Sequence, residues 1–290
     1  MRVGLHALGI ANGARPEIVR AVARAAEAHG FSRLWAGEHV VLVDAPVSRY
    51  PYSDDGRIAV PADADWLDPL LALSFAAGVT DEIGLATGVL LLPEHNPVVV
   101  AKQVATLDVL SAGRFTLGVG IGWSADEFAA LGVPFARRGR RTEEYLAAMR
   151  TLWREDVATF EGHFTHFRNA RVNPKPVRDR SIPVVMGGNG DEALRRAATV
   201  ADGWYGFNLP AAEAVERVSV LAGLCAEHDR PMEELTVAVA LTDASPEMLP
   251  ELARAGVTEL VVVDAPPATP DEAGDWVAAL AGRWLAPAGS

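Results

Sequence analysis

Residues 83–120 have the sequence IGLATGVLLLPEHNPVVVAKQVATLDVLSAGRFTLGVG, and this stretch decides the fold class. It begins and ends with continuous apolar runs, 83–91 and 115–120. Such runs are expected of strands that are buried on both faces of a sheet. Asn96-Pro97 starts a helix between them. The stretch therefore predicts a strand–helix–strand unit of a parallel sheet.

The same alternation of strands and helices continues outward in both directions. Strands are predicted at 3–7, 32–37, 83–91, 115–120, 182–186, 203–207, 235–241 and 260–263. Helices are predicted at 16–28, 68–77, 96–110, 142–153, 191–200, 211–228 and 271–284. Eight strands alternating with helices favour a closed (β/α)8 TIM barrel, which needs about 250 residues. A doubly wound sheet would require a glycine-rich fingerprint after the first strand, and residues 8–13 do not fit that pattern. We therefore expect one α/β barrel domain over residues 1–290.

Two segments depart from the alternation. Residues 38–67, after the second strand, form no periodic element and are rich in Pro, Asp, Gly and Tyr. A loop this long inside a compact domain is usually functional, often as a lid. After the fourth strand comes an insertion that contains the helix 142–153 and a proline-rich stretch near 173–176. We expect substrate specificity to lie in the loop 40–66 and in this insertion.

Charge and composition narrow the classes of partner. The formal net charge of −12 argues against a nucleic-acid surface and against binding to anionic membranes. The single cysteine, Cys225, lies in a helical apolar run, where it is expected to fill core, and it can form no internal disulfide. We expect no signal peptide, and the sequence has no long uncharged apolar stretch. We expect a cytoplasmic homodimer that binds a small molecule.

Working residues of a β/α barrel lie at the carboxyl ends of its strands. His39 follows the second strand, and a histidine there can act as acid or base near neutral pH. The competing interpretation is a structural histidine that only bonds its neighbours. The full set of strand-end candidates is His6, Glu38, His39, Thr87, Gly88, Val89, Gly120, Ile121, Gly122, Trp123, Gly187, Gly188, Asn189, Gly190 and Asn208.

Two glycine-rich strand ends are candidates for ligand binding. Gly187-Gly188-Asn189-Gly190 precedes a helix, where glycines and free N–H groups can hold a phosphate. A tight strand-to-helix turn is the alternative. In the run 118–123, alternating glycines leave room for something flat, and Trp123 either stacks on a ring system or fills core.

A cluster of arginines in the insertion, Arg137, Arg138, Arg140 and Arg141, is either a solvated face or a contact for an anionic cofactor tail. Metal binding has little support. His163 and His166 are spaced like ligands but lack a partner set, and no His-Glu-x-x-His motif occurs. We expect no metal. A Gly-x-Ser-x-Gly elbow and a P-loop are also absent.

At this point the sequence resembles the luciferase-like monooxygenase family over nearly its whole length. It is most similar to the branch of coenzyme F420-dependent (deazaflavin) oxidoreductases. The matching runs are 28–39, 85–93, Asn96-Pro97, 101–103, 105–114, 118–123, 183–188 and 201–204.

The resemblance implies that the cofactor ring lies in the barrel mouth. It implies a non-proline cis peptide at Gly88-Val89 and a catalytic acid–histidine pair formed by Glu38 and His39. Trp123 stands where sugar-phosphate dehydrogenases of the family carry a glutamate proton donor, so that substrate is not expected here. The cofactor contacts implied by the resemblance or proposed from the glycine turns are Thr87, Gly88, Val89, Gly120, Gly122, Trp123, Gly187, Gly188 and Asn189.

The resemblance implies hydride transfer between F420 and a small organic substrate. The alternative is a two-component monooxygenase that uses reduced flavin mononucleotide (FMN) and oxygen. The fold does not separate the two. A cofactor-binding protein without turnover is a third hypothesis.

Overall fold

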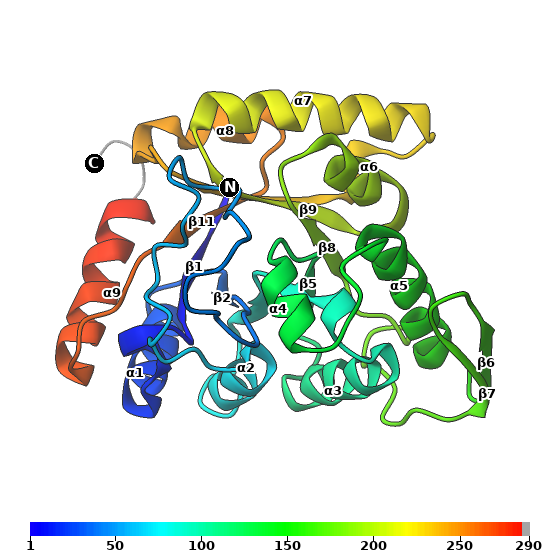
Figure 1. Ribbon diagram of the computed structural model, residues 1–290. Helices are drawn as coiled ribbons and strands as arrows, with labels where there is room; N and C mark the ends of the chain where they lie inside the picture. Colours follow the sequence, from blue (N-terminus) through cyan, green and yellow to red (C-terminus); the bar gives the residue numbers. More distant parts are fainter. Residues whose placement is uncertain (286–290) are drawn as a thin grey trace.

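The computed structural model describes residues 1–285, which form a closed barrel of eight parallel strands wrapped by helices (Figure 1). Strand β1 pairs with β2 on one side and with β11 on the other, and a pairing between β3 and β5 closes the ring. The predicted (β/α)8 barrel is confirmed. Its strands are β1 (Arg2–Leu8), β2 (Arg33–Ala36), β3 (Gly84–Thr87), β5 (Phe115–Gly120), β8 (Val184–Gly187), β9 (Gly203–Leu209), β10 (Thr236–Leu241) and β11 (Glu259–Val263).

Two of the helices on the outside of the barrel begin at residues whose side chains cap the first turn. Asp68 Oδ1 accepts a hydrogen bond from Leu71 N, and Asn96 Oδ1 accepts one from Val98 N, each just before a proline in the first turn. The outer helices are α1 (Pro16–Ala28), α2 (Pro69–Ala77), α3 (Pro97–Leu110), α5 (Arg138–Arg154), α6 (Asp191–Val200), α7 (Ala211–Glu227), α8 (Leu249–Ala255) and α9 (Pro270–Trp284). Helix α8 was not predicted, because seven residues are too few to show a helical period.

The predicted strand 83–91 is in fact two strands. The peptide bond Gly88–Val89 is cis, as the resemblance implies, and separates β3 from a short continuation, β4 (Leu90–Leu91), which pairs with β5. The insertion between β5 and β8 also contains more than α5. It includes α4 (Ala125–Ala130) and a hairpin of β6 (Ala158–Glu161) and β7 (His166–Ala170). Neither was predicted, since α4 is short and the hairpin carries mostly exposed residues.

The interior of the barrel is packed rather than hollow. A cluster of buried side chains fills it, and the Trp35 and Tyr205 rings stack at 4.7 Å between centroids. At the amino-terminal end of the strands, the buried Glu259 accepts hydrogen bonds from Trp35 Nε1 and Arg33 Nη1. The barrel is therefore filled, and its carboxyl-terminal mouth is where a ligand can approach.

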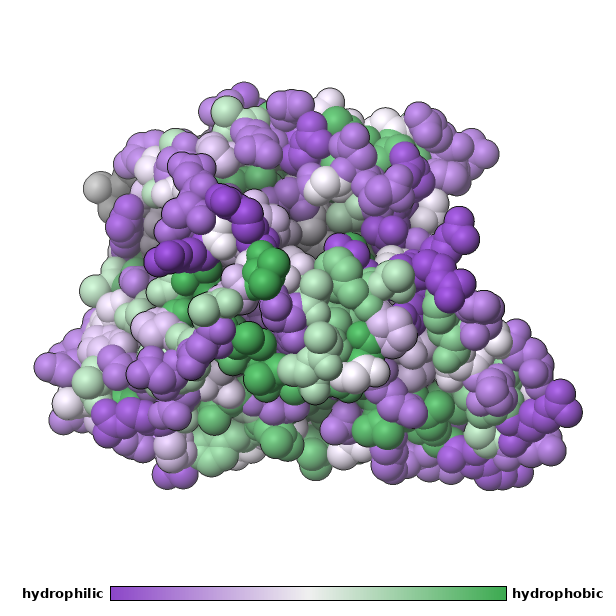
Figure 2. Space-filling view, viewed as in Figure 1, coloured by the Kyte–Doolittle hydropathy of each residue, from purple (hydrophilic) through white to green (hydrophobic). Residues whose placement is uncertain are grey.

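The surface shows apolar side chains on the outer faces of two neighbouring helices. Leu71 of α2 is 70% exposed and Leu110 of α3 is 64% exposed. Figure 2 shows hydrophobic residues gathered on the lower part of this face, where these helices lie. Such a patch suits the expected homodimer, which stays a prediction. Within residues 1–285, none of the helices has the length and apolar character needed to traverse a bilayer.

Candidate active site at the barrel mouth

The long loop after β2 is tied down at both ends. At its start, the Glu127 carboxylate of α4 accepts hydrogen bonds from Val40 N (2.7 Å) and Val41 N (3.2 Å). At its end, Trp66 Nε1 donates to Gly37 O (3.0 Å). The loop therefore leaves and rejoins the barrel at fixed points and arches over the mouth.

Aromatic side chains from the middle of this loop cross the mouth. The Tyr50 ring contacts Trp123 and Tyr52, with centroids 5.2 Å and 5.4 Å away, and Tyr52 in turn contacts Phe207 of β9 at 5.9 Å. Asn208 Nδ2 donates to Tyr52 O (2.7 Å). Burial raises the pKa of both tyrosine hydroxyls, so they stay protonated. The strand-end candidate Asn208 thus holds this loop, residues 38–67, which we call the covering loop.

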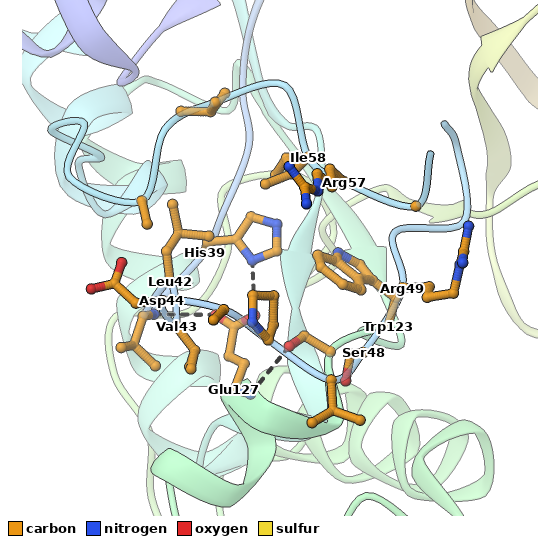
Figure 3. Close-up of a pocket in the computed structure, with 18 of the residues that line it drawn as sticks. His39, Leu42, Val43, Asp44, Ser48, Arg49, Arg57, Ile58, Trp123 and Glu127 are labelled. Carbon is orange, nitrogen blue, oxygen red and sulfur yellow. Dashed lines mark hydrogen bonds and ion pairs between the residues drawn. The ribbon is translucent and has the colours of Figure 1, made fainter. Parts of the chain in front are cut away.

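His39 points into the mouth and is held by Glu127, a residue that is not among the strand-end candidates. Its Nδ1 lies 2.8 Å from Glu127 Oε2, and both side chains are buried (Figure 3). The edge of its ring meets Trp66 and Trp123. Because the carboxylate accepts at Nδ1, Nε2 of the neutral ring is left as an acceptor. Figure 3 shows this second nitrogen directed toward the side where Trp123 lies, so it can exchange a proton with a ligand there.

Glu38 faces the opposite way from His39, as consecutive residues of an extended segment do. Its Oε2 accepts from Leu91 N (2.6 Å), and its Oε1 lies 3.0 Å from His95 Nε2. Burial lowers the pKa of His95, but the hydrogen bond to Glu38 and its charge outweigh this and raise it. Glu38 thus ties the end of β2 to β4 and to the segment after it, and its catalytic role stays a prediction.

A local signal for Glu127 was present in the sequence. Ser124 caps α4, with its Oγ accepting from Glu127 N at 3.2 Å, and the spacing Ser-x-x-Glu is that of a capping box. The motif predicts a helix start directly after Trp123. Its glutamate does not fold back on the cap here, and reaches the loop after β2 instead.

Two of the predicted cofactor glycines have a packing role. A Cβ on Gly120 would lie 2.6 Å from Val89 Cγ2, and one on Gly187 would lie 2.8 Å from Val89 Cγ1. Both glycines therefore make room for the Val89 side chain between β5 and β8. Thr87 is fully buried, and its hydroxyl donates to Gly118 O and accepts from Gly118 N. Thr87 thus joins β3 to β5, and Val89, which is half-buried, is the residue of this group that can touch a ligand.

The turn between β8 and α6 has one open face. The Asn189 side chain bonds both Phe207 O (2.8 Å) and Phe207 N (3.1 Å), which fixes the turn against β9. Gly188 has a φ of +112°, a conformation that favours glycine, and a Cβ on Gly190 would meet nothing within 4 Å. The backbone at the head of α6 is therefore accessible to a ligand.

The arginine cluster of the insertion splits into inward and outward members. Arg138 Nε donates to Gly122 O (2.9 Å), and the buried Arg141 donates to carbonyls of Pro93 and Ala136. Arg137 lies over the Phe164 ring and next to His163. His163 and His166 belong to the hairpin side of the insertion, and no group of three or more His, Cys, Asp or Glu within residues 1–285 could hold a metal ion.

His6, the candidate at the end of β1, is enclosed within the barrel. Its Nδ1 lies 3.5 Å from the Tyr205 hydroxyl, and its Nε2 has no hydrogen-bond partner among residues 1–285. Burial lowers the pKa of His6 to about 4, so the ring is neutral at physiological pH. His6 does not line the pocket beside His39.

A third buried carboxyl group lies near the two histidine–glutamate pairs. Glu94, at the end of the short helical turn after β4, is 7% exposed, and neither of its oxygens has a hydrogen-bond partner within the described chain. A Cβ on Gly122 would lie 3.0 Å from Glu94 Oε1. Burial, followed by the charges of Glu127 and Glu38, raises the pKa of Glu94 from 4.5 to about 9. The group is therefore neutral at pH 7.

This raised pKa makes stability depend on pH. The folded state binds the Glu94 proton more tightly than the unfolded state. The contribution of this group to the free energy of unfolding is therefore fully present below about pH 4.5 and is lost as the pH rises toward about 9. We expect Glu94→Gln, which cannot ionise, to raise the free energy of unfolding above about pH 8 by roughly 1–3 kcal/mol, and to leave it unchanged near about pH 4. Urea unfolding across this range measures both. Glu38→Gln is the matched control and should destabilise instead. A gain for Glu94→Gln that does not depend on pH would contradict the assignment.

A pocket of about 610 Å³ lies beside His39, between the covering loop and the start of α4 (Figure 3). His39, Trp123, Ser124 and Glu127 form its wall toward the barrel, and residues 41–49 and 55–62 supply most of the rest. The fold and this mouth together define a (β/α)8-barrel protein with an enzyme-like site at the carboxyl ends of its strands.

The chain belongs to the luciferase-like monooxygenase family, whose sequence model matches residues 3–277. The uncharacterised protein Rv0953c of Mycobacterium tuberculosis (strain ATCC 25618 / H37Rv) is 37% identical over 265 residues, which are 91% of this chain and 92% of that protein. The FMNH2-dependent dimethylsulfone monooxygenase of Pseudomonas putida is 34% identical over 124 residues, 42% of this chain and 34% of that enzyme.

Among solved structures, the coenzyme F420-dependent tetrahydromethanopterin reductase of Methanopyrus kandleri matches with a TM-score of 0.77. The match covers 98% of both chains at 17% sequence identity. At that identity the likeness concerns the fold. The chain thus has a flavin-dependent monooxygenase among its partial sequence relatives and shares its fold with an F420-dependent reductase.

Proposed function

We propose that this protein transfers a hydride between coenzyme F420 and a small organic substrate. The observation that carries the proposal is the buried His39–Glu127 pair, which leaves one imidazole nitrogen facing a 610 Å³ pocket. Moving a hydride to or from an alcohol or carbonyl carbon also moves a proton at the oxygen. One positioned histidine is sufficient for that proton.

The residues at the mouth fit a cofactor with a flat ring and an anionic tail. Val89, set between Gly120 and Gly187, offers an apolar surface for a ring, and the Trp123 indole lies beside His39 and Tyr50. Gly188 and Gly190 leave the backbone at the head of α6 open, where N–H groups and the helix dipole favour a phosphate. When bound, the deazaflavin supplies the site that accepts or donates the hydride.

In this proposal the residues of the chain have separate tasks. His39 Nε2 holds or releases the substrate proton, and Glu127 orients the ring and stabilises its protonated form. Tyr50 and Tyr52 exclude water from the mouth. Asn189 acts through Phe207, as the tie that keeps the phosphate turn in place.

A flavin monooxygenase remains the second candidate. The partial identity to the FMNH2-dependent dimethylsulfone monooxygenase favours it. Deazaflavin carries hydride and reacts poorly with oxygen, whereas reduced FMN reacts with it, so the identity of the bound cofactor separates the two functions.

We expect the purified cofactor-free protein to bind F420 at least about tenfold more tightly than FMN, a difference of about 1.4 kcal/mol. The full-length resemblance to the deazaflavin branch is the reason. Quenching of F420 fluorescence and of FMN fluorescence in parallel titrations measures it. Micromolar binding of FMN with no binding of F420 would favour the monooxygenase. Tight binding of F420 with no turnover on any alcohol or enone would favour a cofactor-binding protein.

A further inference from the structure

The pocket beside His39 combines an apolar lining with an arginine whose guanidinium forms no hydrogen bond within residues 1–285. Among its lining residues are Leu42, Val43, Val47, Ile58, Val60 and Pro61, all from the covering loop. Arg57 belongs to the same lining, and its side chain forms no hydrogen bond or ion pair with any other residue in 1–285. Figure 3 shows its guanidinium on the side of the pocket where the His39 ring and the Trp123 indole lie.

Two of the three acidic residues of the pocket, Glu127 and Asp44, are turned away from Arg57, and the third, Asp55, lies beside it. Glu127 is occupied by His39 Nδ1 and by the backbone N–H groups of Val40 and Val41. Asp55 Oδ1 accepts from Arg57 N (2.9 Å); this hydrogen bond is the first cause that lowers the pKa of Asp55, and the charge of the Arg57 guanidinium adds to it. In Figure 3 the Asp44 carboxylate points away from His39 and Trp123. A ligand close to His39 therefore meets a positive charge and apolar walls.

The other arginine of the loop is in a different situation. Arg49 Nη2 donates to Asp54 O at 3.3 Å, and its guanidinium packs over Gly56, where a Cβ would lie 2.6 Å from Arg49 Nε. In Figure 3 it points away from the His39 ring. Arg57 is thus the guanidinium of this loop that is placed to meet a ligand near the reacting position.

From this arrangement we propose that the substrate is a mainly aliphatic molecule that carries an anionic group, and that Arg57 binds the anion. The apolar side chains take the carbon skeleton, and a guanidinium holds a carboxylate through charge-assisted, often bidentate hydrogen bonds. This inference rests on the proposed function only in treating the pocket as the substrate site. It does not depend on which cofactor is bound.

Three probes with the same chain and different charge test the proposal: octanoate, octan-1-ol and octylammonium. Each is titrated by calorimetry into the cofactor-loaded protein and into the cofactor-free protein. We expect octanoate to bind about tenfold more tightly than octan-1-ol, which is the range of a hydrogen bond to a charged group. Octylammonium should bind most weakly. Raising the salt concentration should weaken the binding of octanoate and leave the binding of octan-1-ol unchanged.

Two matched variants locate the effect. Arg57→Gln should abolish the preference for octanoate, and Arg49→Gln, on the same loop, should retain it. Equal binding of octanoate and octan-1-ol, or a preference that survives in Arg57→Gln, would overturn the proposal. Thermal midpoints equal to that of the parent establish that both variants are folded. Cofactor titrations of the same samples keep the two proposals apart. A preference for octanoate in a protein that does not bind F420 would contradict the proposed cofactor and would still support Arg57 as the residue that binds the anion.

Discussion

His39→Asn is expected to lower kcat by about 10²–10⁴, the range for loss of a positioned acid or base. Asparagine retains polar contacts but cannot titrate, so the loss should come with a flattened pH profile of kcat. Cofactor affinity should change little, because the histidine faces the pocket and its ring is held by Glu127. Steady-state kinetics with a substrate found by screening oxidisable alcohols and reducible enones provides the measurement.

The second histidine–glutamate pair offers the matched control. His95 bonds Glu38 on the side away from His39, so His95→Asn should lower thermal stability and leave the pH profile of kcat in place. Glu127→Gln should also lower kcat, because a protonated His39 ring loses the charge that stabilises it. If His95→Asn reproduced the loss and His39→Asn had normal turnover, the acid–base role would move to the Glu38 side of the site.

Replacing Gly188 with Val is expected to weaken cofactor binding by more than about tenfold, because the position has a φ of +112° and faces the proposed phosphate site. A Cβ there would lie 3.1 Å from Ala193 Cβ and 4.0 Å from the Tyr52 hydroxyl, so the larger side chain meets both the helix and the covering loop. Backbone strain of about 1–3 kcal/mol adds to the effect. Fluorescence titration gives the affinity, and circular dichroism reports whether the barrel is folded.

Gly190→Ala is the control for this substitution. Gly190 has an ordinary backbone conformation, and an added Cβ meets nothing within 4 Å, so affinity should stay within about twofold of the parent. A folded Gly188→Val protein with unchanged affinity would move the phosphate to another part of the mouth, with Arg138 beside Gly122 as the next candidate.

Much of the fold was accessible from the sequence because its determinants are local. Strands buried on both faces appear as continuous apolar runs, and Asp68 and Asn96 cap helices through side-chain bonds to residues two or three positions away. The short helices α4 and α8 and the exposed hairpin were missed. They are too short or too polar to leave a periodic pattern.

The site was harder to predict because its partners are distant in the chain. Glu127 lies 88 positions from His39, and closure of the barrel brings the two together. The roles of Gly120 and Gly187 depend on the direction of the Val89 side chain, which cannot be deduced from the amino-acid sequence. The sequence pointed to the strand ends as the candidate site. It could not tell which of the two neighbours, Glu38 and His39, lines the pocket.

The way in which the covering loop is tied has a consequence for how this family member can change over time. Glu127 holds the start of the loop through backbone N–H groups of Val40 and Val41, and the carbonyl of Gly37 receives Trp66 at its end. Neither tie depends on the side chains between residues 49 and 60. Apart from Tyr50 and Tyr52, whose rings contact Trp123 and Phe207, that stretch can therefore exchange its side chains: mutations there can reshape what is admitted to the mouth while the His39–Glu127 pair stays in place. New substrate ranges are within reach of a few substitutions on this arch.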